Sequence, residues 1–306
     1  MRDVAAGRGL GGRRCICKGG FLLLTALALV WGGPPVAGAF SEKDITLSSN
    51  SIPQGGVCLL RIRTGRGEVP EAVWCNAKVY LKTPGEGGEW RGFIAADLRT
   101  RPGTYPLVVR IPPSGREARC PIRILEKDYG VRRLTLPKKM VDLDAETLKR
   151  VHEESRVMKD LWEMPICEPL WTGPFLRPVP GDVVGPFGRR SIINEQPRSP
   201  HSGVDLRGES GTPVMAANGG RVVLTSDHFF SGNSVVIDHG GGIYSMYFHL
   251  REIAVKQGQE VDKGQVIGLV GATGRATGPH LHWGIRINGA RVDPLQFTEV
   301  SGELEE

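Results

Sequence analysis

Two short histidine motifs, far apart in the chain, constrain the fold more than any other feature of this sequence. They are His201-Ser202-Gly203-Val204-Asp205 and Gly278-Pro279-His280-Leu281-His282-Trp283. Zinc in a hydrolytic site takes about three protein ligands and keeps one open position for water. His201, Asp205 and His282 supply two imidazoles and one carboxylate. A fold that uses all three must bring the two motifs side by side.

The residues around both motifs favour extended backbone. A proline and two small residues surround His201, so we expect no helix there and place His201 and Asp205 on a curved extended segment, both pointing inward. His280 and His282 are two residues apart in a predicted strand, and alternation puts both on one face. With the ligand count satisfied by His282, His280 is left free to face the bound water or the substrate.

A further histidine, His249, lies at the end of the predicted strand Tyr247-Phe248-His249-Leu250. A zinc ion lowers the pKa of bound water to about 7. His249 and His280 can share the remaining work: one takes or relays the proton, and the other stabilises the oxyanion or protonates the leaving amine. The sequence leaves open which of the two has which role.

The motifs hold four of the seven histidines in the chain. The other three are predicted to have no catalytic role. His152 lies in a predicted helix and His228 in a predicted turn, and we expect both at the surface. His239 precedes three glycines, and a hairpin-turn role is favoured for it over catalysis.

Residues 1–39 have the pattern of a secretory signal peptide. Five basic side chains precede or flank a short apolar run at residues 20–31, and Ala37-Gly38-Ala39 offers a cleavage site of small residues. The run is shorter than the roughly 20 residues that a bilayer requires; an uncleaved N-terminal anchor is the alternative. We expect an exported protein of the periplasm or cell envelope, without a membrane segment after cleavage.

Charge gives no support for nucleic-acid binding. The whole chain has a net charge of +6, but residues 40–306 hold 34 basic and 32 acidic side chains. A nucleic-acid-binding domain normally has a strongly basic face. We therefore exclude nucleic acid as a partner.

Four cysteines remain after residue 39, and none has the spacing of a zinc ligand. An exported chain can keep disulfides, and four cysteines allow three pairings. Three of the four lie in the N-terminal half, where we expect one disulfide pair. The four are Cys58, Cys75, Cys120 and Cys167.

The N-terminal half after the signal segment is predicted to be β-structure. Residues 40–127 contain short strands, such as 57–63 and 105–111, separated by glycine and proline turns without a helical period. This pattern predicts a small immunoglobulin-like β-sandwich that acts as a spacer or binding module.

A linker and a second domain follow. Residues 128–170 contain an amphipathic helix at about 144–163, which Asp144 can cap. Its apolar stripe is expected to pack on a neighbouring domain rather than bind a partner. Residues 171–300 are predicted to form an antiparallel all-β domain with tight glycine turns and no helix, followed by an acidic tail at 301–306.

The site residues resemble those of the lysostaphin-like, LytM-type zinc metallopeptidases, which cut peptidoglycan cross-links. The similarity covers residues 174–297 and includes Gly211-Thr212-Pro213-Val214, Asp238-His239-Gly240, Gly271-Ala272-Thr273-Gly274 and Val292-Asp293-Pro294. It implies a β-rich fold of the duplicated-hybrid-motif type, with one zinc ion held by His201, Asp205 and His282. It also implies catalytic roles for His249 and His280, and none of these five positions is substituted.

We therefore expect an exported zinc metalloendopeptidase that hydrolyses cross-links or stem peptides of peptidoglycan. One alternative is a non-catalytic wall-binding regulator or activator of another wall hydrolase, and the intact ligand set argues against it. Another is a metallopeptidase for glycine-rich proteins. Related N-terminal modules bind the wall, position the enzyme or occlude the groove, so self-inhibition is a further expectation. Asn194 matches an inhibitory asparagine of some relatives by location only, and an ordinary loop role is favoured.

Overall fold

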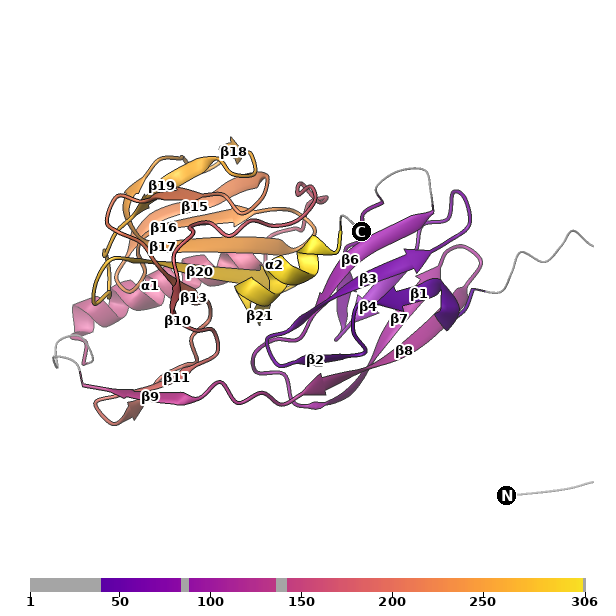
Figure 1. The fold of residues 1–306 in the computed structure, drawn as a ribbon, viewed down its shortest axis with the longest axis horizontal. Helices are drawn as coiled ribbons and strands as arrows, with labels where there is room; N and C mark the ends of the chain where they lie inside the picture. The colour runs from indigo at the N-terminus through magenta and orange to yellow at the C-terminus, as the bar shows by residue number, and fades with distance from the viewer. Residues whose placement is uncertain (1–39, 84–87, 136–141, 305–306) are drawn as a thin grey trace, which may run out of the picture. The chain divides into compact units, whose positions relative to one another are not determined.

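Figure 1 shows the computed structural model, which describes residues 40–83, 88–135 and 142–304. The described residues all belong to one contact unit, Ala39–Glu306. The predicted signal peptide lies outside them. Within the described ranges, no helix is both long enough and apolar enough to cross a membrane.

The N-terminal region consists of two β-sheets that share one core. The first has the strand order β1-β3-β6 and the second β2-β8-β7-β4-β5. The chain is thus mostly β, as predicted, whereas an immunoglobulin-like topology stays a prediction. The elements are η1 (Glu42–Asp44), β1 (Ile45–Leu47), β2 (Ser51–Pro53), β3 (Val57–Arg63), β4 (Glu71–Trp74), β5 (Ala77–Val79), β6 (Glu89–Ala95), β7 (Gly103–Ile111) and β8 (Arg116–Leu125).

Strand β3 is buried on both faces, which explains its continuous apolar sequence. Cys58, Leu60 and Ile62 belong to the core shared by the two N-terminal sheets. Val57 and Leu59 belong to a second core, which continues through the C-terminal region. The three-stranded sheet therefore packs against both the five-stranded sheet and the C-terminal region.

Polar contacts reinforce this attachment. The Arg291 guanidinium lies 2.6 Å from the Asp97 carboxylate, and the Arg291 backbone N–H also donates to it. Burial raises the pKa of Asp97, but the hydrogen bonds from Arg291 outweigh it and the pKa lies below its usual value. Phe93 of β6 contacts Phe297 edge-on, with ring centroids 5.1 Å apart.

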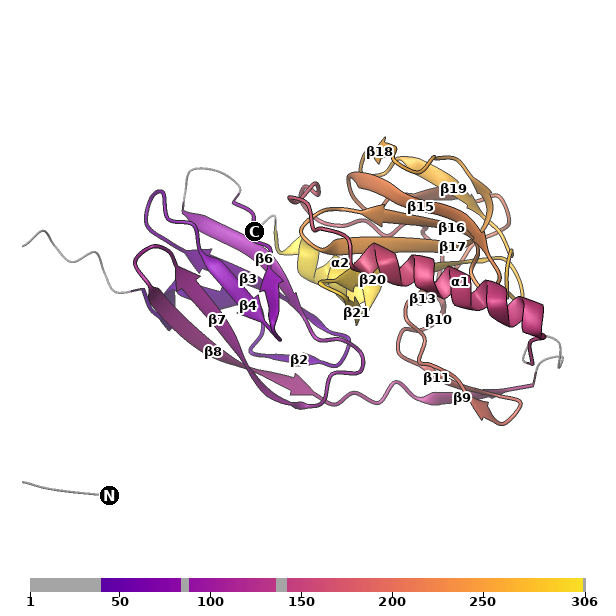
Figure 2. The ribbon, with the colours of Figure 1, turned by 180° about the vertical axis from the view of Figure 1, so that it is seen from behind.

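The linker contributes a strand and a helix. Strand β9 (Val131–Leu134) pairs in parallel with β11 (Arg190–Ile193), and β12 (Gln196–Pro197) completes this small sheet. Helix α1 (Ala145–Trp162) begins at Asp144, whose carboxylate accepts from the Thr147 N–H. Figure 2 shows α1 lying across one face of the C-terminal sheet, where Leu161 packs against Val236 and its neighbours.

The C-terminal region is a ten-stranded antiparallel sheet. Its main path is β10-β13-β20-β17-β16-β15-β18, while β14 pairs with β19, β19 also pairs with β17, and β21 pairs with β20. The strands are β10 (Val183–Gly185), β13 (Val204–Arg207), β14 (Pro213–Met215), β15 (Gly220–His228), β16 (Gly232–Asp238), β17 (Ile243–Ile253), β18 (Glu260–Val261), β19 (Val266–Val270), β20 (His280–Ile287) and β21 (Ala290–Val292).

One helix was not predicted in this region. Helix α2 (Pro294–Gly302) begins with a proline in its first turn, and Asp293 caps it by accepting from the Leu295 N–H. The prediction of no helix after residue 171 was wrong because a helix of this length shows little periodicity. Ser301, expected in the acidic tail, is fully buried in α2, and its hydroxyl accepts from the Phe175 N–H.

The expected disulfide in the N-terminal half was also wrong. Cys58, Cys75, Cys120 and Cys167 are all free thiols. Cys58 is buried in the sandwich core, where the Ser49 N–H lies 3.3 Å from its sulfur. Cys75 is exposed in a tight turn with φ +47°. The cysteines thus occupy different environments, which spacing along the chain does not reveal.

Candidate active site

Three adjacent strands position the predicted site residues. Strand β20 lies between β13 and β17, and Asp205 of β13 is directly opposite His282 of β20. On the other side of β20, Phe248 of β17 is opposite His282. His201 lies just before β13 and outside any helix, as expected. The register therefore brings the two motifs together.

The three predicted metal ligands converge on one point. His201 Nε2 lies 2.9 Å from His282 Nδ1, and each of these nitrogens lies 3.0 Å from Asp205 Oδ1. Two ligand atoms of one tetrahedral zinc ion are about 3.4 Å apart. The observed triangle is slightly tighter than that, and its two-imidazole, one-carboxylate donor set is one that zinc accepts. These residues fit a single metal ion.

Backbone carbonyls fix which nitrogen each histidine presents. The Nδ1 atoms of His201, His249 and His280 lie 2.8–3.0 Å from the carbonyl oxygens of Pro186, Thr273 and Gly278. A carbonyl only accepts, so each Nδ1 carries the hydrogen, and in the neutral ring Nε2 keeps its lone pair. His282 differs, because its Nδ1 faces the other ligand atoms.

Charge in the site is set by burial and by the histidine–carboxylate contacts. Burial raises the pKa of Asp205, but hydrogen bonds from His201 and His282 outweigh it, and the pKa falls well below its usual value. Burial lowers the pKa of His282 despite its bond to Asp205. An ionised Asp205 carboxylate beside a neutral His282 imidazole is the protonation state that binds a metal cation.

His249 lies where β17 changes partners. Residues up to Phe248 pair with β20, whereas those from Leu250 onward pair with β19. His249 itself has φ +63° in a register shift against β16. The prediction that this strand ends at His249 was wrong, because β17 continues through His249 to Ile253. The bulge redirects the His249 side chain.

His249 and His280 lie together beside the ligand triangle. Their ring centroids are 4.8 Å apart, and the His249 ring is 6.2 Å from that of His282. His280 Nε2 lies 3.8 Å from Asp205 Oδ1. Burial lowers the pKa of His249 to about 4. All five predicted site residues thus form one cluster.

Sequence reasoning missed the groups that hold this cluster in place. The Phe248 ring is stacked on His282 at 5.4 Å and 4°. The carbonyl of Thr273 orients His249, and the Thr273 hydroxyl donates to the Leu250 carbonyl. Phe248 and Thr273 lie inside the segments that resemble the peptidase family, but carbonyl acceptors have no residue-type signal, so only the structure reveals them.

The other histidines lie outside the cluster. His228 is buried at the end of β15, so the surface position predicted for it was wrong: the helix α1 covers this part of the sheet, and its tertiary packing is invisible in local sequence. His239 is fully buried, with Nδ1 2.8 Å from the Gly219 carbonyl and Nε2 2.7 Å from Ser245 Oγ. His152 is exposed, as expected. Asn194 has φ +50° and forms, with Glu195, the turn between β11 and β12.

Comparison with known proteins identifies relatives of this region. Residues 199–294 match peptidase family M23. Peptidoglycan DD-endopeptidase ShyA of Vibrio cholerae serotype O1 is 47% identical over 98 residues, which cover 32% of this chain and 23% of that protein. DD-carboxypeptidase/endopeptidase Mpg of Neisseria meningitidis serogroup B is 39% identical over 122 residues, 40% of this chain and 28% of that protein. The chain thus spans about a quarter of the length of these curated relatives.

A solved structure matches a larger part of the chain. The crystal structure of a peptidase M23 protein from Pseudomonas aeruginosa is 34% identical, with a TM-score of 0.63. The match covers 81% of this chain and 95% of that one, so it includes N-terminal residues as well as the site. On this similarity, and on the family match over the site itself, the chain belongs to peptidase family M23.

Proposed function

We propose that this protein is an exported zinc metalloendopeptidase that hydrolyses cross-links or stem peptides of bacterial peptidoglycan. The observation that carries the proposal is the triangle of ligand atoms from His201, Asp205 and His282, with sides of 2.9–3.0 Å. These three residues would hold one zinc ion per chain. Two further histidines beside the triangle, both with a defined tautomer, make the cluster suited to catalysis as well as to metal binding.

Zinc supplies Lewis-acid chemistry, which acidifies water and polarises a carbonyl group. The protein's own residues then have to move protons. His249 and His280 each present Nε2 as a lone pair, because Nδ1 donates to a backbone carbonyl. With its pKa lowered by burial to about 4, His249 is neutral at pH 7 and can accept a proton.

A protonated His249 or His280 can then donate to the leaving amine or to the developing oxyanion. The two rings are close enough, at 4.8 Å between centroids, to act on the same scissile bond. The fixed Nδ1–H bonds keep both rings oriented, so little reorganisation is required during the reaction. Which ring accepts and which donates is left open in this proposal.

The substrate and the compartment come from similarity and from the N-terminal sequence. Both curated relatives are named as endopeptidases, and ShyA as a peptidoglycan DD-endopeptidase. Peptidoglycan lies outside the cytoplasm, in agreement with the signal-peptide pattern of residues 1–39. The periplasm or cell envelope is therefore the proposed location.

Digestion of purified sacculi tests this proposal. The mature chain, loaded with zinc, is expected to release peptide fragments, to stop after treatment with a chelator and to recover when zinc is restored. Mass spectrometry of defined muropeptides then identifies the bond that is cut. Binding to sacculi without release of any fragment would instead support a regulator of another wall hydrolase.

A further inference from the structure

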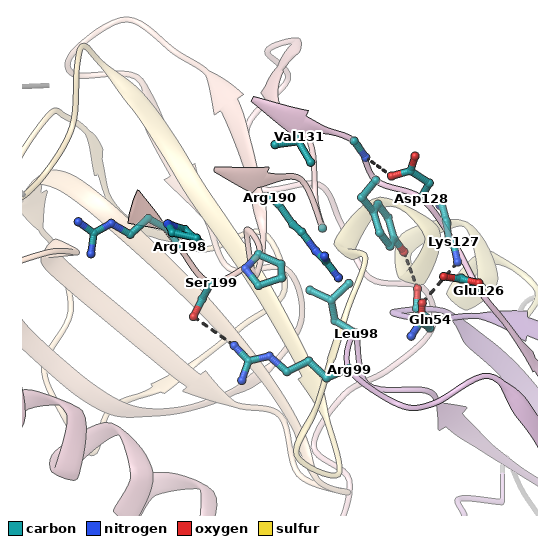
Figure 3. Close-up of a pocket in the computed structure, with 15 residues that line it drawn as sticks. Gln54, Leu98, Arg99, Glu126, Lys127, Asp128, Val131, Arg190, Arg198 and Ser199 are labelled. Atoms are coloured by element: carbon teal, nitrogen blue, oxygen red, sulfur yellow. Dashed lines mark hydrogen bonds between the residues drawn. The ribbon is translucent and has the colours of Figure 1, made fainter. Parts of the chain in front are cut away.

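A pocket of about 810 Å³ is lined by several charged side chains (Figure 3). Three parts of the chain line it: loops of the N-terminal region, through Gln54 and Arg99; residues 126–131, which follow β8; and the segment 188–200. Its last lining residues, Ser199 and Pro200, immediately precede the metal-ligand candidate His201.

Backbone hydrogen bonds connect the pocket wall directly to His201. The Gly188 N–H donates to the His201 carbonyl at 2.9 Å, and the His201 N–H donates to the Arg189 carbonyl at 3.0 Å. Gly188 and Arg190 both line the pocket. The pocket wall and the metal-ligand candidate His201 are therefore held together by main-chain hydrogen bonds.

The pocket is a packed feature of the fold. Gly188 has φ +76°, and a Cβ there would lie 2.3 Å from the ring of Tyr129, so only glycine allows this contact. The Tyr129 ring packs edge-on against Phe187 at 5.5 Å, and its hydroxyl donates to the Gln54 carbonyl at 2.5 Å. A wall fixed by such contacts is preorganised for a ligand.

Three cations, each from a different wall, lack an anionic partner. Arg99 donates to the neutral Ser199 hydroxyl at 3.1 Å, and the Lys127 ammonium lies 4.7 Å from the ring centre of Tyr129. Over the described ranges, the side chains of Arg99, Lys127 and Arg190 form no ion pair with a carboxylate.

Other charged side chains also line the pocket. Arg198 differs from Arg190: in Figure 3 its guanidinium points away from that of Arg190, and it donates to Gln196. Two carboxylates, Glu126 and Asp128, also line the pocket, and Asp128 accepts from the Gly130 N–H.

We propose that this pocket is a subsite for a carboxylate of the peptide substrate, read by Arg190 and Arg99 with Lys127 alongside. The inference rests on the proposed function, because it takes the substrate to be an acidic peptide that passes the metal site. Arginine binds carboxylates through two parallel hydrogen bonds, which gives both charge and geometric selectivity. The N-terminal region, which supplies Arg99, would then form part of the substrate site.

Two cross-linked peptides that differ only in one carboxylate, free or amidated, test the subsite. The full mature chain is expected to have a lower KM for the free acid than for the amide. Arg190→Gln and Arg99→Gln should each raise KM for the acid about tenfold, with kcat and the KM for the amide unchanged. Arg101→Gln is the matched control, since Arg101 is exposed nearby but does not line the pocket.

Fluorescence anisotropy with the same labelled peptides separates this proposal from the proposed function. Cleavage of both peptides with equal KM would overturn the subsite and leave the peptidase activity standing. Tighter binding of the acid without cleavage would support the subsite and contradict the activity. If the two arginine variants weaken acid and amide alike, the pocket does not recognise the carboxylate.

Discussion

Two groups of histidines in the C-terminal region differ in whether their hydrogen bonds are complete. His239 uses both ring nitrogens, one toward the Gly219 carbonyl and one toward Ser245 Oγ. The hydrogen-bond network continues from the Ser245 hydroxyl, which donates to the Tyr247 hydroxyl at 2.9 Å. The Tyr247 hydroxyl also accepts from the Ala217 N–H. His201, His249 and His280 instead use Nδ1 for a backbone carbonyl, and Nε2 of His201 lies in the ligand triangle.

The contrast separates a structural histidine from candidate functional ones. A buried polar group without a partner is costly, so complete networks such as that of His239 stabilise the fold. In the active-site cluster, ligand atoms of two histidines converge on the carboxylate of Asp205, and a shared cation would stabilise that arrangement. Burial alone does not distinguish the groups, because His239, His249 and His282 are all buried.

The largest expected effect comes from removing a ligand. His282→Ala should abolish zinc binding and reduce peptide release to background, because only two of the three protein ligands then remain. Zinc measured by mass spectrometry and fragment release from sacculi check both outcomes. His239→Gln is the matched control from the complete network and should keep one zinc ion. Normal zinc content in His282→Ala would contradict the assignment of His282 as a metal ligand, in contrast to His239.

A smaller loss is expected when a proton-transfer residue is removed and the ligands are kept. His249→Ala should retain zinc and lose turnover by about 10²- to 10⁴-fold, the usual range for general acid–base groups. Zinc content and kcat measured on the same preparation check this. Cleavage at the wild-type rate would exclude His249 from catalysis, and zinc loss would make it a ligand.

The complete network predicts a pH dependence of stability. Burial lowers the pKa of His239 to about 4 from its ordinary 6.5, so the unfolded chain binds the proton more tightly than the folded one. The contribution of His239 to the free energy of unfolding is therefore retained above pH 6.5, and about 3 kcal/mol of it is lost as pH decreases toward 4.

Urea unfolding of the wild type and of His239→Gln between pH 7 and pH 4 measures this contribution. The wild type should lose more stability than the variant across that window, and the difference between the two slopes isolates His239 from other titrating groups. Parallel slopes would mean that His239 does not titrate in this way.

Much of the site was predictable because its residues are chemically distinctive. Histidine and aspartate are usual zinc ligands, which singled out His201, Asp205 and His282. Strand alternation correctly placed His280 and His282 on one face. The orienting carbonyls of Pro186, Thr273 and Gly278 were not predictable, because every residue carries such a group.

The fold was predictable where local patterns decide it and not where tertiary contacts do. Short strands and glycine turns indicated β-structure, and Asp144 indicated the start of α1. The burial of His228 under α1 and the second buried face of β3 depend on what packs against them. The pocket beside His201 likewise joins residues from three distant segments, which no local pattern connects.

The metal content of the mature chain tests the central claim most directly. Inductively coupled plasma mass spectrometry of protein purified without any chelator should find about one zinc ion per chain, as expected for one three-ligand site. Protein that folds normally and contains no zinc, and that binds none when zinc is added, would contradict the account.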